Sequence, residues 1–593
     1  MIKIEVLIYL PIILGFLTLL AKPWSKWVAL PSALLALVLA GIVFFDKQAS
    51  TLSSGIFLAA AFFTFSTILY SIKFAEGKEY QNKLLGYFII SLGATAGIVF
   101  AVDYAVMVAF WGILGTYLYL CIGLGGSNAA AAAKKTLIIV GGTDALMLVG
   151  VGIIYCITNS LTIGYVPIPL NGLLPILAFL FIAVGALTKA GAIPLHSWIP
   201  DSAEVAPLPV MAFLPAAIDK LVGIYLLYRI SINIFLVVPN SAVSLCLLTI
   251  GSITIIVAVM AALIQHNLKK LFSFHAVSQV GYMVIGIGSG IPIAIAGGLF
   301  HMLNHAIYKS LLFLTAGAVE KETGTTELDQ LGGLGKIMPI TFTCALIASL
   351  SISGIPPFNG FVSKWMIYQG IVELAKFGPL WIIWLTAAMF GSALTLASFV
   401  KILHAVFLGQ QANTAAKAHE VHWTMWLPMA TLAFICVVFG VFAFPLPLTH
   451  FILPVVGTVA FIGSFSPVIA LALLIVGLLI GWIIYKAGNS KQISTKPIYI
   501  GGEILSSDQT KVSGTTFYNT IKDWGFLPKI YKAAEQQLFD LYAILGKVSN
   551  GIAGMLGYLH DGHLQTYLAW MLLGILLLGL TFYFEYFGPF LGI

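Results

Sequence analysis

Long apolar runs, joined by short connections that carry polar residues, glycine or proline, make up most of the chain. A helix needs about 20 mainly apolar residues to cross the hydrocarbon core of a bilayer. Runs of this length predict about sixteen crossings, and with them an all-α, polytopic membrane protein. The predicted crossings lie near residues 4–21, 27–45, 55–73, 84–102, 104–124, 135–156, 172–200, 207–229, 241–264, 270–289, 292–319, 339–373, 379–408, 424–446, 454–485 and 564–587.

Two of these runs, 172–200 and 339–373, contain helix-breaking residues beside a lysine. The breaking residues are Gly191 and Pro194 in the first run and Gly354, Pro356 and Pro357 in the second. Because proline lacks an amide donor and clashes with the preceding turn, we expect both helices to break there. Lys189 precedes its break and Lys364 follows its break. We interpret this opposite order as the mark of an inverted repeat of the kind found in transporters.

One long polar segment, near 486–563, interrupts the apolar pattern. Its second half carries apolar residues such as Phe526, Ile530 and Leu538 near helical spacing, with charged residues between them. We expect an amphipathic helix along the membrane surface, and a soluble linker helix is the alternative. The chain then divides into N-terminal crossings (1–83), a first inverted repeat (84–230), a second inverted repeat (231–410), additional crossings (411–485), the inside polar segment with a lateral helix (486–563) and a final crossing (564–593).

Composition excludes a set of soluble domains. Hydrophobic residues make up 60% and charged residues 9% of the 593-residue chain, and the mean hydropathy is +1.02. Both values are typical of a protein built from membrane crossings. The N-terminal run lacks a small-residue cleavage pattern, so we expect it to be the first crossing and not a signal peptide.

The net charge of +7 is explained by topology and does not require a nucleic-acid partner. If the N-terminus lies outside, 20 of the 29 lysine and arginine residues fall in inside loops, as the positive-inside rule requires. Four fall outside (Lys3, Lys47, Arg229 and Lys376) and five fall within crossings (Lys189, Lys220, Lys309, Lys364 and Lys401). The asymmetry supports a multi-pass membrane protein with this orientation, which we expect to lie in a prokaryotic cytoplasmic membrane.

The five cysteines all lie in apolar segments, and none forms a Cys-x-x-Cys pair. Iron–sulfur clusters, structural zinc and disulfide frameworks are therefore not expected. The sequence carries no nucleotide fingerprint or flavin motif either, so we expect no cofactor in this chain.

Ionisable residues inside crossings are the candidates for chemistry. A charge at the middle of a membrane costs about 2.5–3.5 kcal/mol on insertion scales, so Lys189 and Lys220 are functional candidates by default. His301, His305 and Lys309 follow one another at steps of four and share one helix face. This spacing favours a proton path. Structurally satisfied histidines and a metal or haem site are the alternatives, and the lysine on the same face disfavours the metal.

Acidic residues within crossings are few. Asp144 is a lone carboxylate in the run 135–156. Since burial disfavours the charged form of a lysine and a nearby carboxylate favours it, a pair with Lys189 would give a switchable proton affinity. A hydrogen bond within its own helix environment is the other reading of Asp144. Asp219, Lys401 and His196 are further candidates, and Lys401 also lies where a lysine side chain can simply reach the membrane surface.

Six motifs in order resemble a known family. They are the Lys189 segment continuing as AGAIPLHSWIPDSAEVAPLPV, the Asp219-Lys220 pair, LIQHNLKKLFSFHAVSQVGYM, FHMLNHAIYKSLLFLTAG, LDQLGGL and GIPPFNGFVSK. They resemble the antiporter-like subunits shared by respiratory complex I, Mrp-type cation/proton antiporters and membrane-bound energy-converting hydrogenases. The resemblance is strong over about residues 50–410. It is closest to the distal large subunit with a lateral helix, in the hydrogenase branch.

The resemblance implies a role for each matching residue. Lys189 matches the central lysine of the first half-channel and Lys220 the bridging residue. His301, His305 and Lys309 match the family's relay in the run 292–319, and Lys364 matches the terminal lysine of the second half-channel. One departure stands out. The family usually has Trp-Glu where this chain has Trp111 followed by Gly112, and we expect Asp144 to replace the missing acid.

The resemblance therefore implies a non-catalytic subunit that moves protons, or exchanges them for Na⁺, within a redox-driven membrane complex. We expect its partners to be other membrane subunits and, through them, peripheral redox subunits. The iron–sulfur clusters and a nickel–iron centre are expected in those partners. A subunit of a stand-alone Mrp antiporter or of complex I is one alternative, and a passive membrane anchor is an alternative of another class.

Overall fold

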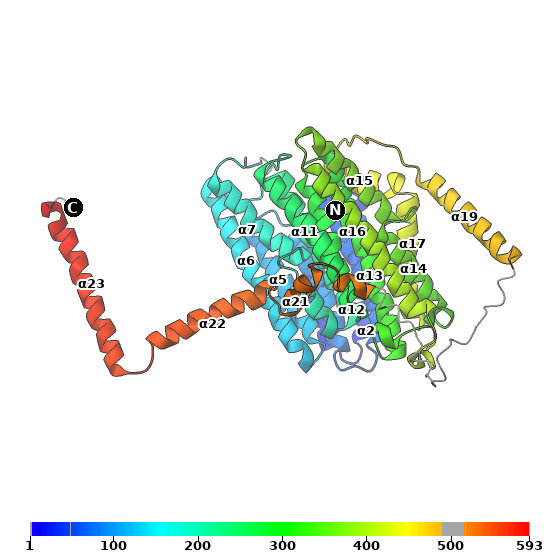
Figure 1. Cartoon of the computed structure of the whole chain (residues 1–593), viewed down its shortest axis with the longest axis horizontal. Coiled ribbons are helices and arrows are strands. Elements are labelled where there is room, and N and C mark those ends of the chain that lie inside the picture. Colours follow the sequence, from blue (N-terminus) through cyan, green and yellow to red (C-terminus); the bar gives the residue numbers. More distant parts are fainter. Residues whose placement is uncertain (1–2, 48, 165–166, 489–514, 516–517, 592–593) are drawn as a thin grey trace. The chain divides into compact units, whose positions relative to one another are not determined.

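The computed structural model describes residues 3–47, 49–164, 167–488, 515 and 518–591. Among them no β-strand forms, and the predicted all-α, polytopic class is confirmed (Figure 1). Thirteen of the described helices are long and apolar enough to cross a membrane, and three shorter apolar helices accompany them. Residues 1–525 and 526–593 form two compact units, which are described separately below.

The helices of the first unit account for nearly all of the predicted crossings. The crossings before the second repeat are α1 (Ile4–Leu20), α2 (Ser25–Phe45), α3 (Thr51–Phe74), α4 (Gln81–Val99), α5 (Tyr104–Gly123), α6 (Ala130–Thr158), α7 (Leu173–Ala190), α8 (Trp198–Val205), α9 (Leu208–Phe213) and α10 (Asp219–Tyr228). The later helices are α11 (Ala242–Leu263), α12 (Leu268–Gly288), α13 (Pro292–Thr323), α14 (Pro339–Ser353), α15 (Asn359–Glu373), α16 (Trp381–Ile402), α17 (Trp423–Val441), α18 (Leu453–Val456), α19 (Pro467–Ala487) and α20 (Asn519–Lys522). A π-helical turn, Leu214–Ile218, joins α9 to α10.

The polar helices occupy the centre of the first unit. The apolar window within Leu208–Ile234, which contains α9 and α10, is 100% buried, and that of α12 is 94% buried. The corresponding windows of α2 and α16 are only 33% buried, and their apolar side chains face outward. Ionisable side chains in a bilayer must face protein or water, and Lys220 of α10 and His275 of α12 lie in these enclosed helices.

Both predicted breaks occur, with the same local geometry. α7 ends at Gly191 (φ +84°) and α14 ends at Gly354 (φ +78°), each in the left-handed region that favours glycine. At the first break the amides of Gly191 and Ala192 donate to the Leu187 carbonyl, at 2.7 and 2.9 Å. At the second, Ile355 donates to the Leu350 carbonyl at 3.1 Å. Each half-helix therefore ends in a capped turn that leaves other carbonyls free.

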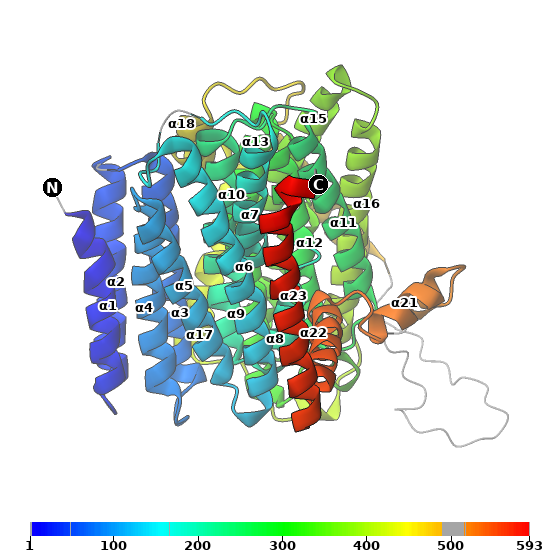
Figure 2. The same cartoon turned by 90° about the vertical axis from the view of Figure 1, so that its left-hand side faces the viewer.

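The two breaks also share their order along the chain. Gly191 is followed three residues later by Pro194, and Gly354 three residues later by Pro357. The half-helices that follow lie at opposite ends of the bundle, α8 toward the bottom and α15 toward the top of Figure 2. A repeat whose second copy is inverted in the membrane keeps its chain order, so the shared order supports the predicted repeats better than the reversed lysine positions do.

The predicted crossing at 454–485 begins later than expected. Its first residues belong to α18, which follows the π-helical turn Phe444–Ile452, and the long helix α19 starts only at Pro467. Gly457, at φ +88°, ends α18. Much of the predicted inside polar segment, residues 489–514 and 516–517, lies outside the described residues.

The second unit contains three helices: α21 (Leu527–Glu535), α22 (Leu541–Leu559) and α23 (Leu564–Leu591). The predicted amphipathic stretch is therefore two helices, which Gln537 interrupts with a φ of +58°. The N-terminus of α22 is capped by Asp540, whose side chain accepts from the Tyr542 amide at 3.1 Å. A course of α22 along the membrane surface stays a prediction.

Close helix contacts in the first unit depend on glycine. A Cβ atom added to Gly251 of α11 would stand 2.8 Å from the Gly281 carbonyl oxygen of α12 and 2.6 Å from Cγ1 of Ile285. Small residues allow membrane helices to pack backbone against backbone, where van der Waals contact replaces the hydrophobic effect. The α11–α12 pair is therefore fixed at a separation that no larger residue permits.

We predict that Gly251→Val destabilises the protein, because an overpacked helix contact costs about 1–3 kcal/mol. Its thermal midpoint in detergent and its yield of monodisperse protein should both fall. The matched control is Gly152→Val in α6, where an added Cβ meets nothing within 4 Å. Equal stability of the two variants would contradict the close packing.

Candidate functional site

The predicted basic residues all lie inside the first unit. Lys189, Lys220 and Lys309 are 0% exposed, and Lys364 and Lys401 are 2% exposed. His301 and His305 are 0% exposed as well. Since buried charge is costly in a membrane, this concentration of basic groups marks the candidate site.

Trp111 joins Asp144 and Lys189 at the first-repeat end of this site. The indole Nε1 donates to Asp144 Oδ1 at 2.9 Å, and Lys189 Nζ donates to the Trp111 carbonyl oxygen at 3.3 Å. The ammonium also lies over the indole ring, 4.8 Å from its centroid, which is a cation–π contact. No direct ion pair between Asp144 and Lys189 occurs in this part of the described structure, so the tryptophan mediates their contact.

Gly115 of α5 leaves the space between these two groups. A Cβ atom at position 115 would stand 3.7 Å from Asp144 Oδ2 and 3.9 Å from Lys189 Nζ. A Cβ atom at Gly112, where the family usually has its acid, would meet nothing within 4 Å. The α5 position that faces both charged groups is therefore 115, one helical turn beyond Trp111. Replacement of the acid by Asp144 stays a prediction.

Lys220 reaches the first helix break. Its Nζ lies 3.1 Å from the point that a Cβ on Gly191 would occupy, at the carboxyl end of α7. The free carbonyls of a helix end carry a partial negative charge, which favours a cation there. Asp219 precedes Lys220 on α10, and among the described residues neither its carboxylate oxygens nor Lys220 Nζ has a hydrogen-bond partner. Both are therefore buried polar groups free to exchange partners.

Lys364 reaches the second break in the same way. Its Nζ donates to the Ile352 carbonyl oxygen, near the end of α14, at 2.9 Å. Its side chain also packs against Gly354, and the ammonium lies 4.7 Å from the centroid of the Tyr282 ring. Each break thus receives a lysine ammonium at the carboxyl end of its first half-helix. By this criterion Lys364 corresponds to Lys220, although Lys364 comes from its own broken crossing and Lys220 comes from the crossing after the break.

Helix α13 lies between the two breaks. His305 lies beside the backbone of Ala216, and the charges of Lys220, Lys309 and His301 act on it. His301 instead meets the second repeat: its Nδ1 lies 2.9 Å from Ser363 Oγ and its Nε2 lies 3.2 Å from Gln279 Oε1. The two histidines of the predicted path therefore face opposite halves of the chain.

Lys309 lies in a cage of aromatic rings. Its Nζ is 5.2 Å from the Phe272 centroid and 5.8 Å from those of Phe313 and Phe399. It has no hydrogen-bond partner among the described residues. Cation–π contacts stabilise an ammonium by about 2 kcal/mol or more when water is excluded. The three rings therefore stabilise the charged form of Lys309 without a hydrogen bond to it.

The three further candidates lie near the ends of the site. Lys401, at the end of α16, donates to the carbonyl oxygens of Leu263 and Gln265 at 2.7 and 2.8 Å. It is buried and caps the carboxyl end of α11, so its ammonium does not reach out to the membrane surface. His196 is half-buried in the connection between α7 and α8. Roles for these residues in transport stay predictions.

One polar row escaped the sequence reasoning. His275, Gln279 and Tyr282 follow at helical spacing on α12 and are 0% exposed. His275 Nε2 lies 2.7 Å from Ser398 Oγ, and the Tyr282 hydroxyl donates to the Ala388 carbonyl at 2.7 Å. The sequence signal for this row is the helical spacing of its polar residues, the same signal that identifies the polar face of α13. The segment entered the sequence analysis only as one of the six family motifs.

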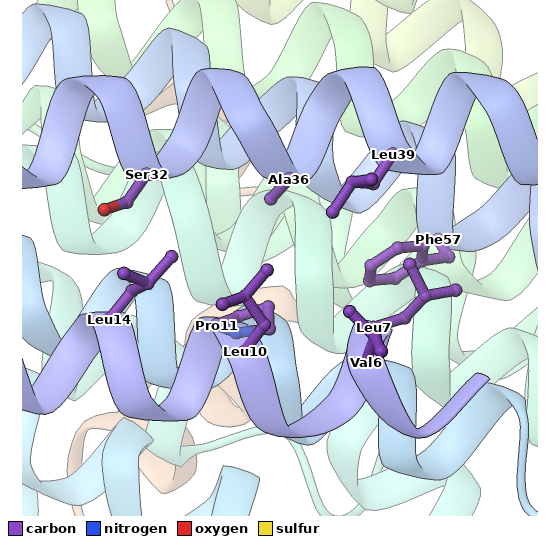
Figure 3. A pocket seen from close by; sticks show the side chains of 9 residues that line it. All are labelled: Val6, Leu7, Leu10, Pro11, Leu14, Ser32, Ala36, Leu39 and Phe57. Carbon is purple, nitrogen blue, oxygen red and sulfur yellow. The ribbon is translucent and has the colours of Figure 1, made fainter. Parts of the chain in front are cut away.

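The described residues contain no group of three or more His, Cys, Asp or Glu side chains that could hold a metal. The best-formed hollow lies between α1, α2 and α3, and its lining is apolar apart from Ser32 (Figure 3). It is separate from the buried lysines and holds no ionisable group.

Known proteins resemble this chain in sequence. A family model described as "NADH:quinone oxidoreductase/Mrp antiporter, TM" matches residues 101–395. The Na⁺/H⁺ antiporter subunit A1 of Staphylococcus haemolyticus is 33% identical over 407 residues, which cover 63% of this chain and 49% of that protein. Subunit A1 of Staphylococcus saprophyticus is 31% identical over 411 residues, with the same coverage. The chain thus spans about half the length of these curated relatives.

Solved structures share the fold. A chain of the membrane-bound sulfane sulfur reductase, an archaeal respiratory membrane complex, has a TM-score of 0.81 at 24% identity and covers 97% of this chain and 99% of its own. A chain of the Mrp complex from Dietzia sp. DQ12-45-1b has a TM-score of 0.69 at 19% identity, with 77% and 97% coverage. A chain of respiratory complex I from Thermus thermophilus has a TM-score of 0.67 at 20% identity, with 76% and 98% coverage.

At these identities the structural matches establish the fold alone, and the hydrogenase branch stays a prediction. The sequence matches and the fold agree with the six motifs. The segment matched by the family model contains Asp144, Lys189, Lys220, Lys309 and Lys364. The chain therefore belongs to the family of antiporter-like membrane subunits that complex I and the Mrp antiporters share.

Proposed function

We propose that this chain is the ion-translocating, antiporter-like subunit of a multi-subunit membrane complex, and that it conducts protons along its buried basic side chains. The observation that carries the proposal is the series of buried lysines and histidines that links one helix break to the other through α13. Sodium/proton exchange is the variant that the curated relatives' names favour.

The chemistry of the side chains supports conduction. Lysine can release its proton when buried, whereas arginine stays charged. Lys220 and Lys309 lack hydrogen-bond partners among the described residues, and an unpaired buried group is costly unless its charge or partners change. A row of such groups would therefore change partners or pass protons at a low energetic penalty.

The driving reaction would belong to partner subunits. The sulfane sulfur reductase chain matches this chain over nearly its whole length, whereas the Mrp and complex I chains match about three quarters of it. This difference favours a redox-driven complex as the assembly. The more specific identity that we propose for this complex is an energy-converting hydrogenase in a prokaryotic cytoplasmic membrane. Its peripheral subunits would carry iron–sulfur clusters and a nickel–iron centre.

Purification of the intact complex from native membranes, followed by mass spectrometry and metal analysis, tests this assembly. Nickel and iron with hydrogenase-like subunits would support this more specific identity. Redox subunits with iron but without nickel would support the redox-driven complex and overturn the hydrogenase branch. Mrp-type partners without redox metal would make the chain an antiporter subunit instead.

We predict that Lys189→Ala and Lys364→Ala each abolish proton transport while the complex still assembles. Removing a costly buried charge should not unfold the crossings, but it interrupts the path. The measurement is dye-reported proton uptake by proteoliposomes of the purified complex, driven by an imposed potassium diffusion potential. Lys83→Ala, in an inside loop by the sequence reading, is the control. Normal uptake in both lysine variants would refute conduction and leave the passive anchor.

A second prediction concerns the tryptophan-bridged pair. Asp144→Asn should suppress transport strongly, since Lys189 then loses the carboxylate that shares the space beside Gly115 with it. Adding Gly115→Asp to this variant should restore transport in part, because its carboxylate would enter the space beside Lys189 Nζ. Gly112→Glu, the change that the family resemblance suggests, should restore less because position 112 faces open space. A silent Asp144→Asn would show that Asp144 does not replace the missing acid.

A further inference from the structure

We propose that the second repeat has its own proton entrance on the inside face, at His266 and Asp329, and that protons pass from there through Lys401, Ser398 and His275 to Lys309. The inference rests on the proposed function and adds a route and a conducting residue, His275, to it. Its evidence is a series of contacts between α11, α12, α16 and the loop after α13.

The entrance is an exposed acid–base pair. His266 Nδ1 lies 2.9 Å from Asp329 Oδ2, and the two side chains are 45% and 49% exposed. His266 lies in the inside loop between α11 and α12, and Asp329 lies in the short helix Leu328–Gln330 that follows α13. Both side chains are therefore open to water and to protons from the bulk solution.

Lys401 lies directly beneath this pair. Its Nζ donates to the carbonyl oxygen of Gln265, the residue before His266, and to that of Leu263. It is 2% exposed. The amine is thus the first buried titratable group behind the exposed pair. Its two carbonyl contacts hold the protonated form in place, next to the surface that would supply the proton.

Ser398 and His275 continue the series inward. Ser398 precedes Lys401 by three residues on α16, so the two side chains share a helix face. Its hydroxyl oxygen lies 2.7 Å from His275 Nε2. His275 Nδ1 has no hydrogen-bond partner among the described residues. An imidazole bound on one nitrogen and free on the other can accept a proton on one side and release one on the other.

His275 then meets Lys309 across a shared aromatic ring. The His275 ring lies 4.8 Å from the Phe399 centroid, and Lys309 Nζ lies 5.8 Å from that centroid. Lys309, Lys364 and Lys401 all act electrostatically on His275. The histidine therefore lies among the three lysines of the second repeat.

The competing explanation is structural: Lys401 caps α11 and His275 only satisfies Ser398. Two substitutions separate the explanations. Lys401→Arg keeps a cation and can donate to both carbonyls, but arginine does not release its proton. His275→Gln keeps a side chain that bonds Ser398, but its amide does not titrate. The rate of proton transport should fall by about tenfold or more in both the Lys401→Arg and the His275→Gln variants. A positioned proton-transfer group typically raises a rate by about 10²-fold or more.

The experiment uses the purified complex in proteoliposomes, with proton uptake driven by the same potassium diffusion potential. Lys270→Arg, at a half-exposed ion pair with Glu204, and His404→Gln, at an exposed position on the continuation of α16, are matched controls expected to transport normally. Yield and thermal midpoint report assembly. Ser398→Ala, which removes the hydroxyl link, replaces His275→Gln if that variant does not assemble.

Loss of transport in both variants with normal controls supports the entrance. Normal transport in either Lys401→Arg or His275→Gln overturns it. If the entrance is overturned in this way but Lys364→Ala is inactive in the same assay, the proposed function still stands. If Lys189→Ala and Lys364→Ala also transport normally, the proposed function itself fails.

Discussion

The penalty for placing charge in hydrocarbon organises this protein. A crossing as polar as α13 is stable only when other helices surround it completely, and its residues from Ile293 to Val319 are all buried. The surrounding helices in turn expose apolar side chains outward, as α2 and α16 do. Because the same penalty applies inside the bundle, each lysine there has found a carbonyl, a ring or a helix end. Architecture and chemistry thus follow from one constraint.

The two broken helices provide most of these contacts. A continuous helix satisfies its own carbonyls, so it offers nothing to a buried ammonium. α7 ends at Gly191 and α14 at Gly354, deep in the bundle; Lys220 Nζ lies beside the first end, and Lys364 Nζ donates to a carbonyl at the second. Two lysines from different crossings therefore occupy equivalent environments, which the reversed order of Lys189 and Lys364 along the chain concealed.

Sequence reasoning predicted the class, most crossings and the buried basic residues, because apolar length and isolated charges are local properties. The residues that a side chain contacts are not a local property of the sequence. The role of Trp111 as the link between Asp144 and Lys189 depends on how α5, α6 and α7 pack, and the orientation of Gly115 depends on helix rotation. His275 was visible in the sequence, but its importance comes from Ser398, more than a hundred residues away. The start of α19 at Pro467, with Ser466 as its N-cap, was also missed, because hydropathy alone does not locate a helix end inside an apolar run.

The phenylalanine cage around Lys309 has a consequence for hydration. When the amine is neutral, Phe272, Phe313 and Phe399 surround a group that binds water weakly, and an apolar constriction of this kind tends to dry. When the amine is charged, the ammonium attracts water into the same space. Wetting of the centre would therefore follow the charge of one side chain. A column of water across the protein would last only as long as that charge, which prevents a permanent leak.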